Sequence, residues 1–252
     1  MPTERQTKAT MCTVSFIYKG NDEFVLTSNR DESPVRETKA PALYTVSDTK
    51  LVFPKDVVGG GTWIGMSHQK RVVCLLNGGF TFHTRLPEYR HSRGIVVNDF
   101  LTSENIEKTV TEYNLNMIEP FTIVIVDWNE SLQLFELVWD GEQKHFQKLP
   151  VVTPHIWSSS TLYSEEMKQL RRNWFAEFQQ KGQLDAASLM NFHTTAGVGN
   201  PDVDVIMDRY FVKTISITQI EKTADELSMK YHDLTKDTES VIAFNPIEAL
   251  HE

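Results

Sequence analysis

The sequence has 252 residues and a mass of 28.9 kDa, and its 40% hydrophobic and 23% charged residues are typical of a globular protein rather than a disordered chain. Its formal net charge of -9 disfavours a nucleic-acid partner, because phosphate binding needs a basic surface. No stretch of about 18 or more apolar residues is present, so we expect no membrane span. Residues 1–10 are polar and do not resemble a signal peptide.

The two cysteines, Cys12 and Cys74, are too few for a disulfide framework and indicate a reducing compartment, so we expect a cytoplasmic protein. The 8 histidines show no metal-ligand spacing, and we expect neither a metal nor a cofactor. The length favours one domain, residues 11–252, which follows a polar N-terminal extension over residues 1–10.

Two hairpins are predicted in the first third of the chain. The first pairs Cys12–Tyr18 with Phe24–Thr27, both rich in β-branched and aromatic residues, across a polar turn. The second pairs Thr62–Met66 with Val72–Leu76 and follows the glycine run at 59–61. Because that run precedes a strand rather than a helix, we do not interpret it as a phosphate-binding loop.

Helices and a meander are predicted in the middle of the chain. Ile95–Leu101 is one helix, and Ser103 is the expected N-cap of a second helix whose apolar residues recur at helical spacing. The strands of the meander are Phe121–Trp128, Leu132–Trp139 and Lys144–Leu149, with a hairpin turn at Asp140-Gly141.

The last third begins with a long helix that Ser164 caps and Gly182 ends. Strands at both ends of the chain with helices between them predict a layered α+β sandwich rather than βαβ winding. The remaining predicted elements are a helix over Leu184–Phe192 and strands over Thr214–Ile220, Glu226–Tyr231 and Ser240–Phe244.

The first hairpin brings a thiol beside polar residues, because the start of one antiparallel strand neighbours the end of its partner. A nucleophilic thiol needs a cation or donor, a carboxylate to orient a base, and an amide to hold an oxyanion. Arg30, Asp31 and Asn29 supply these groups next to Cys12. The same run could instead be a solvated turn with a salt bridge, and Glu32 could face either a ligand or solvent.

Four segments in this order resemble the NRDE family, the family of transport and Golgi organisation protein 2. The resemblance covers essentially the chain from Met11 onward. It implies an N-terminal-nucleophile hydrolase-like αββα sandwich of two mainly antiparallel sheets. The family is similar in its opening to the cysteine amidases that cleave bile-salt conjugates, penicillin V and fatty acid amides. The segments are Met11-Cys12-Thr13-Val14, Thr27-Ser28-Asn29-Arg30-Asp31-Glu32-Ser33-Pro34, Gly60-Gly61-Thr62-Trp63-Ile64-Gly65 and Leu75-Leu76-Asn77-Gly78.

The resemblance implies roles for individual residues. Cys12 would be the nucleophile, and its α-amine, freed by initiation at Met11 or by loss of residues 1–11, would be the base. An α-amino pKa of about 7.7 to 8.0 suits that role. Arg30 and Asp31 would tune the thiol and the amine, and Asn77 would donate to the oxyanion, although a turn before Gly78 explains this asparagine equally well. The implied substrate-binding residues are Asn29, Glu32, Ser159, Ser160 and Lys213.

The chain departs from the amidase pattern at three places, the first of which is that Cys12 does not stand at position one or two. Ser159-Ser160 stands where related sequences carry a Ser-Asn pair, and Lys213 lies near the position of a late arginine, whose planar fork lysine lacks. We also expect Cys12, beside Arg30 in a polar and partly open place, to be more reactive than Cys74, whose aliphatic neighbours indicate a buried thiol.

Three functions are consistent with these residues. The leading hypothesis is a cysteine hydrolase that cleaves the C–N bond of a linear, small-molecule amide through an acyl-enzyme on Cys12. The alternative is a non-catalytic binding or trafficking protein that holds haem or an acyl-lipid ligand in the same pocket. The third is a protein-interaction module whose site is inactive.

Overall fold

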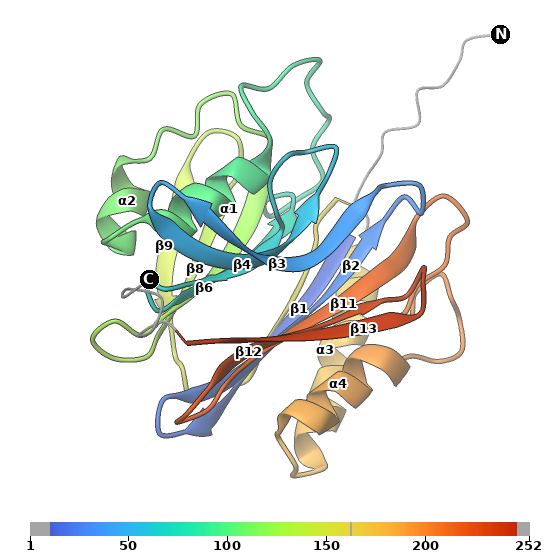
Figure 1. Ribbon diagram of the computed structural model, residues 1–252. Coiled ribbons are helices and arrows are strands. Elements are labelled where there is room, and N and C mark those ends of the chain that lie inside the picture. Colours follow the sequence, from blue (N-terminus) through green and yellow to red (C-terminus); the bar gives the residue numbers. More distant parts are fainter. Residues whose placement is uncertain (1–10, 162, 246–252) are drawn as a thin grey trace, which may run out of the picture.

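Two antiparallel sheets, stacked face to face, form the body of the molecule (Figure 1). The structure is a computed structural model and describes residues 11–161 and 163–245. The predicted extension over residues 1–10 and the last residues of the predicted domain, 246–252, therefore lie outside the described residues.

Sheet A contains both ends of the described chain. Its strand order is β10-β1-β2-β11-β12-β13, so the first hairpin lies between the edge strand β10 and the C-terminal meander. Its strands are β1 (Met11–Gly20), β2 (Glu23–Glu32), β10 (His155–Ser158), β11 (Lys213–Lys222), β12 (Leu227–Asp233) and β13 (Thr238–Phe244).

Sheet B is a meander in chain order, β3-β4-β5-β6-β7-β8-β9. Each strand pairs with the next through a short connection, except that α1 and α2 are inserted between β6 and β7. Its strands are β3 (Thr38–Val46), β4 (Thr49–Asp56), β5 (Ile64–Ser67), β6 (Arg71–Asn77), β7 (Phe121–Asp127), β8 (Gln133–Trp139) and β9 (Lys144–Leu149).

Helices cover the outer face of each sheet. The helices α1 (Arg93–Thr102) and α2 (Ile106–Glu112) lie on the side of sheet B, and α3 (Glu165–Gln180) and α4 (Ala186–Thr195) lie on sheet A (Figure 1). The layer order is therefore αββα, which confirms the expected α+β sandwich.

Strand alternation divides the first hairpin between two cores. On β1, Val14 and Phe16 are buried between the sheets, whereas Ile17 packs against Phe175 and Phe192 of the helices. Complete burial of such a side chain stabilises the fold by about 1.5 to 3 kcal/mol. A one-residue slip of β1 would move both apolar sets to the wrong layer, so the register that places Cys12 is strongly fixed.

The predicted strands and helices are confirmed apart from their bounds, but three strands were missed. Strands β3 and β4 contain Pro41 and Pro54, which weaken a strand pattern, and β3 is an edge strand whose register shifts between Lys39 and Ala42. The third, β10, has only 4 residues.

The predicted cap of the second helix was wrong. Asn105, not Ser103, caps α2, because its side chain accepts a hydrogen bond from the backbone N–H of Lys108. Ser103 instead ends α1. Ser164 does cap α3, as predicted, by accepting from the N–H of Met167.

Candidate functional site

The register of the first hairpin sets the geometry around Cys12. Strand β2 continues to Glu32, so the residues 29–32 are strand residues and the solvated-turn interpretation is wrong. Cys12 lies opposite Arg30, and Met11 lies opposite Asp31. Because successive strand residues point to opposite faces, Cys12 and Arg30 face the space between the sheets, whereas Asn29 and Asp31 make their contacts on the helix side. The polar residues that we expected together beside the thiol are thus divided between the two faces of sheet A.

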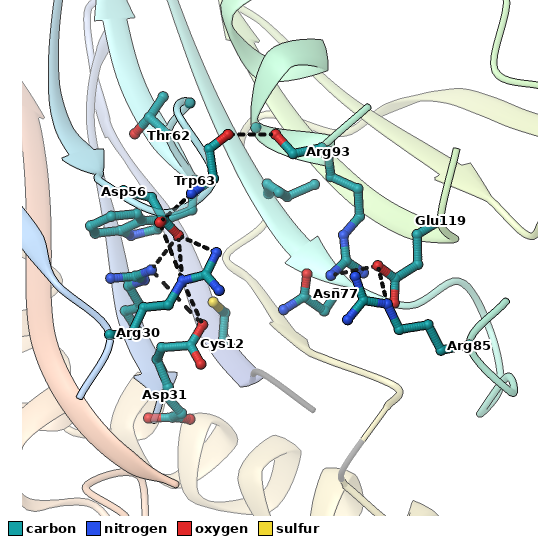
Figure 2. A pocket seen from close by; sticks show the side chains of 17 residues that line it. Cys12, Arg30, Asp31, Asp56, Thr62, Trp63, Asn77, Arg85, Arg93 and Glu119 are labelled. Atoms are coloured by element: carbon teal, nitrogen blue, oxygen red, sulfur yellow. Dashed lines mark hydrogen bonds and ion pairs between the residues drawn. The ribbon is translucent and has the colours of Figure 1, made fainter. Parts of the chain in front are cut away.

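A cavity of about 180 Å³ opens beside Cys12 (Figure 2). Five of the candidate residues line it, namely Cys12, Arg30, Asp31, Glu32 and Asn77. The other lining residues are Arg36, Asp56, Gly59, Gly61, Thr62, Trp63, Leu75, Arg85, Ser92, Arg93, Gly94 and Glu119.

An ionic cluster around Asp56 forms one wall. The Asp56 carboxylate is 2.8 Å from Nη2 of Arg30 and 3.0 Å from Nη2 of Arg36. The Arg30 guanidinium also lies over the indole of Trp63, 4.0 Å from the ring centroid. Glu32 is buried and stands 3.9 Å from both arginines, so it borders the cavity rather than solvent.

A second ionic cluster, around Glu119, lies across the cavity (Figure 2). Its carboxylate is 3.3 Å from Arg93, 3.7 Å from Arg85 and 3.6 Å from His83. Arg93 is the first residue of α1, so the N-terminus of this helix faces the cavity. Figure 2 shows Asn77 between the two clusters, near Cys12.

The Cys12 thiol is only 4% exposed. Burial raises its pKa well above the ordinary value, and Cys74, Asp31 and Glu32 raise it further, whereas Arg30 lowers it. The thiol is therefore protonated at neutral pH while residue 11 precedes it. The expected partly open environment is wrong, because Cys12 is buried. Burial likewise raises the pKa of Cys74, to about 12.

Asp31 is held by two hydroxyl donors. The Tyr163 hydroxyl is 2.7 Å from one carboxylate oxygen and the Thr214 hydroxyl is 2.5 Å from the other. Burial raises the pKa of Asp31, and these hydrogen bonds and Arg171 oppose the rise. Since Asp31 borders the cavity and its backbone pairs with Met11, it lies next to the peptide bond that precedes Cys12.

Asn29 belongs to a buried network rather than to the cavity. Its side-chain N–H groups donate to the carbonyls of His193 and Val205, so its oxygen must accept from Nδ1 of His193, 2.7 Å away. Nε2 of His193 then accepts from the Ser15 hydroxyl at 2.6 Å. Burial lowers the pKa of His193 to about 3, so the ring is neutral. This network anchors α4 to the first hairpin.

The three remaining candidates also lie outside the lining of the cavity. The N–H of Ser159 donates to the carbonyl of Cys12 at 3.1 Å, and its hydroxyl donates to the carbonyl of Asn77. The hydroxyl of Ser160 is 3.3 Å from the Thr81 carbonyl. Lys213 forms a surface ion pair with Asp208. Ser159 therefore links the backbone carbonyls of Cys12 and Asn77 without lining the cavity itself.

Sequence reasoning missed most of the charged wall. Gly94 of α1 sits against Gly61, where an added Cβ would lie 2.5 Å from the Gly94 carbonyl carbon, and this approach places Arg93 in the cavity. The segment Gly60–Gly65 was a visible signal for such a contact, but its partner on α1 was not. Arg36, Asp56, Arg85 and Glu119 carry no local pattern that distinguishes them from surface charges.

Solved structures with the same fold are acylases and amidases. The penicillin V acylase from Agrobacterium tumefaciens is similar at a TM-score of 0.58 and 12% identity, covering 92% of this chain and 86% of that one. An N-acylethanolamine-hydrolyzing acid amidase orthologue from Caenorhabditis elegans is similar at a TM-score of 0.57 and 12% identity, and the match covers 83% of this chain and 92% of that one. A mutant conjugated bile acid hydrolase from Clostridium perfringens is similar at a TM-score of 0.54 and 7% identity, and the match covers 93% of this chain and 96% of that one. The chain thus has the fold of the N-terminal-nucleophile hydrolases.

The family model described as Transport and Golgi organisation 2 matches residues 11–240. The chain belongs to this family, which confirms the resemblance of its four motifs. No curated protein sequence matches the chain. Within residues 11–161 and 163–245, no helix has the length and hydrophobicity needed to cross a membrane.

Proposed function

We propose that the protein is a cysteine hydrolase that cleaves the C–N bond of a linear amide through an acyl-enzyme on Cys12. The observation that carries the proposal is the register of the first hairpin. It places the thiol of Cys12 and the guanidinium of Arg30 on one cavity wall and pairs Asp31 with the residue that precedes the nucleophile. The shared fold with amide-cleaving enzymes supports the same reaction class.

The proposed base is the α-amine of Cys12. Among the described residues that line the cavity there is no histidine, and a thiol whose pKa is raised by burial needs a base to ionise. An amine freed at residue 12 would lie beside Asp31, which lies opposite Met11 in the ladder. Its unperturbed pKa of about 7.7 to 8.0 is close to neutral pH. The chain that continues through Met11 is the inactive form.

The proposed reaction has two halves. The amine takes the proton of Cys12 Sγ, and the thiolate attacks the amide carbon to form an S–C bond. Asn77 donates a hydrogen bond to the oxyanion. The C–N bond then breaks, and the leaving nitrogen receives the proton from the α-ammonium group. Water, deprotonated by the same amine, attacks the thioester, and the carboxylic acid leaves as the thiol is restored.

The size and charge of the cavity favour a small polar group at the scissile amide. Its volume of about 180 Å³ is below the roughly 300 to 1,000 Å³ of sites for drug-sized ligands. Four arginines and four acidic residues line it, so an apolar chain would be poorly solvated there. We infer that only the part of the substrate around the amide enters.

The second candidate is non-catalytic binding of haem or an acyl-lipid ligand in the same cavity. The observation in its favour is that the Cys12 thiol is buried and protonated while a peptide bond blocks its amine. In that case the arginines would hold a carboxylate or phosphate of the ligand and no bond would break. The state of residue 12 distinguishes the two candidates.

The test compares two forms of the protein, the full chain and one that begins at Met11. Intact mass spectrometry reports whether Cys12 is the first residue of each. Hydrolysis of penicillin V, a conjugated bile acid and an N-acylethanolamine is then measured, with Cys12→Ala as the loss variant and Cys74→Ala as its matched control. We expect activity only where Cys12 is N-terminal. Hydrolysis that survives Cys12→Ala, or an exposed Cys12 with no hydrolysis but retained ligand binding, contradicts the enzyme proposal.

A further inference from the structure

The edge strand β10 presents backbone groups that the sheet does not use. In the part of the chain that the structure describes, it pairs only with β1, and the hydrogen bond from the Ser159 N–H to the Cys12 carbonyl fixes which residues bond across the ladder. Because bonded and non-bonded pairs alternate, Trp157 bonds to Val14, and Ile156 and Ser158 point their N–H and C=O groups away from β1. Within residues 11–161 and 163–245, no other hydrogen bond of these backbone groups is found.

A second cavity, of about 270 Å³, runs along this free edge. Three of the four residues of β10 line it, Ile156, Trp157 and Ser158, and it shares no lining residue with the cavity at Cys12. Its walls come from the region around the end of β6, from β8 and from α3. The apolar lining residues are Leu76, Phe80 and Val138, and the cations are Lys168 and Arg172. The exposed ring of Phe80 stands at one side.

Of the charged side chains in this second cavity, Glu136 has two hydrogen-bond partners, whereas Lys168 has a single, distant ion-pair partner among the described residues. The Glu136 carboxylate accepts from the indole N–H of Trp157 at 2.6 Å and from Gln147 at 2.7 Å. The Lys168 side chain is only 15% exposed, and its ammonium, which has three donors, makes a single ion pair with Glu165 at 3.9 Å within the described residues. A half-buried cation in a cavity along a free strand edge favours an acidic partner.

We propose that β10 and the second cavity bind an extended, acidic segment of a partner protein, which adds to sheet A as a new strand. The outward N–H and C=O pairs of Ile156 and Ser158 lie about 6.6 Å apart along β10, which is the two-residue repeat of an extended peptide backbone. A compact small molecule does not have hydrogen-bonding groups at this spacing. The segment would place an apolar side chain in the cavity and a carboxylate at Lys168. Sheet A would thereby gain the strand that its edge lacks, between α3 and sheet B.

The test uses the full chain and a fluorescein-labelled peptide of about six residues, alternating valine and threonine with one central aspartate. Fluorescence anisotropy measures its binding. The same peptide with alternate backbone amides N-methylated removes the donors that would bond to β10. We expect saturable binding of the first peptide and a loss of about fivefold or more with the second, since each lost hydrogen bond contributes about 1 kcal/mol.

Protein variants test the same contacts from the other side. Ile156→Pro removes an outward N–H and leaves the hydrogen bonds of the β1 ladder in place, as proline does on edge strands, so binding should weaken about fivefold or more. Its melting temperature should fall, because the Ile156 side chain packs against the core between sheet A and its helices, so circular dichroism first shows that the variant is folded at the assay temperature. Lys168→Glu should also weaken binding. Lys181→Glu, which makes the same charge change at the other end of α3, should not.

Several results would overturn the proposal. These are no saturable binding, equal affinity for the N-methylated peptide, or unchanged affinity of an Ile156→Pro variant that is folded at the assay temperature. If Ile156→Pro unfolds, the N-methylated peptide on the wild-type chain decides alone. Octanoate that binds with Lys168 dependence, while neither peptide competes with it, would make the cavity a site for small carboxylates and would also overturn the proposal.

Discussion

Cys12 and Arg30 face each other across the β1–β2 ladder, and the guanidinium of Arg30 is fixed between the Asp56 carboxylate and the Trp63 indole. The cation beside the thiol is therefore positioned before any ligand binds. It does not ionise the thiol, because burial and three neighbouring acidic groups outweigh it. Activation of Cys12 must come from a proton acceptor, which the α-amine would provide.

Arg30→Ala should destabilise the protein, because Asp56 loses its partner at 2.8 Å. The loss should stay below the cost of an uncompensated buried charge, which is about 3 to 5 kcal/mol, because Arg36 remains paired with Asp56. Arg30→Lys keeps the charge but loses the stacking plane on Trp63, so a smaller loss is expected. Urea denaturation monitored by circular dichroism measures both. Lys230→Ala, which breaks an exposed pair with Glu239, is the control and should change stability by less than about 1 kcal/mol. An Arg30→Ala variant as stable as this control would refute the prediction.

His193 should make the protein less stable in acid. The pKa of its neutral, buried ring is about 3 in the fold and about 6.5 in the unfolded chain, so between these values the unfolded state binds one more proton. The contribution of His193 to the free energy of unfolding is therefore fully present above about pH 6.5. Below that pH it falls by up to about 1.4 kcal/mol per pH unit. The raised pKa of Asp31 acts in the opposite direction, above its unfolded value near 3.8.

The measurement is urea unfolding at pH 7.5, 6.0 and 5.0, of the wild type and of His193→Leu. The variant should have a lower free energy of unfolding at every pH, because Ser15 and Asn29 lose their hydrogen-bond partner. Its free energy of unfolding should, however, fall less steeply as the pH is lowered. His232→Leu is the control, because His232 is partly exposed, with ring nitrogens 3.4 Å from Asp237 and 3.8 Å from Glu239. An unchanged slope in His193→Leu would show that the ring is not the group that titrates.

Gly78 should be far less replaceable than Gly182, although both have a left-handed backbone, with φ of +85° and +81°. Alanine at either position costs about 1 to 2 kcal/mol for this conformation. At Gly78 the new Cβ would also clash with the Ser160 hydroxyl oxygen, whereas no atom of the described residues lies within 4 Å of a Cβ at Gly182. Thermal melts of the two variants should therefore differ, with Gly78→Ala the lower. Equal melting temperatures would show that the contact with Ser160 relaxes freely.

Iodoacetamide should modify neither cysteine readily while residue 11 precedes Cys12, because both thiols are buried and have raised pKa values. In a chain that begins at Cys12, we expect faster labelling of Cys12 and unchanged labelling of Cys74. Peptide mapping after a time course in native buffer, with a urea-unfolded sample as the reference for full reactivity, measures both rates. Rapid labelling of Cys12 in the longer chain would contradict the buried geometry.

The fold was largely predictable because its strands and helices carry clear periodicity and caps. β-Branched and aromatic residues predict β1, hydrophobic alternation predicts β11, and Ser164 caps α3 as its sequence indicates. The strands that were missed, β3, β4 and β10, carry a proline or are short, so their pairing depends on neighbours distant in the chain.

The site was predictable only in part. Motifs indicated Cys12, Arg30 and Asn77, which do meet at one cavity. Asn29 was assigned to the site because it adjoins Arg30 in sequence, yet strand alternation turns it toward His193. Arg93 of the far wall reaches the cavity through the contact of Gly94 with Gly61, which no local pattern shows.

The most direct test of the central claim is to trap the acyl-enzyme. A chain that begins at Cys12 is mixed with an N-acylethanolamine or penicillin V, quenched in acid within seconds, and analysed by intact mass spectrometry and peptide mapping. We predict a mass increase equal to the acyl group, located on Cys12, absent from Cys12→Ala and absent from the chain that retains residue 11. Amide cleavage without any acyl adduct on Cys12, or an adduct of equal yield on the longer chain, would contradict the account.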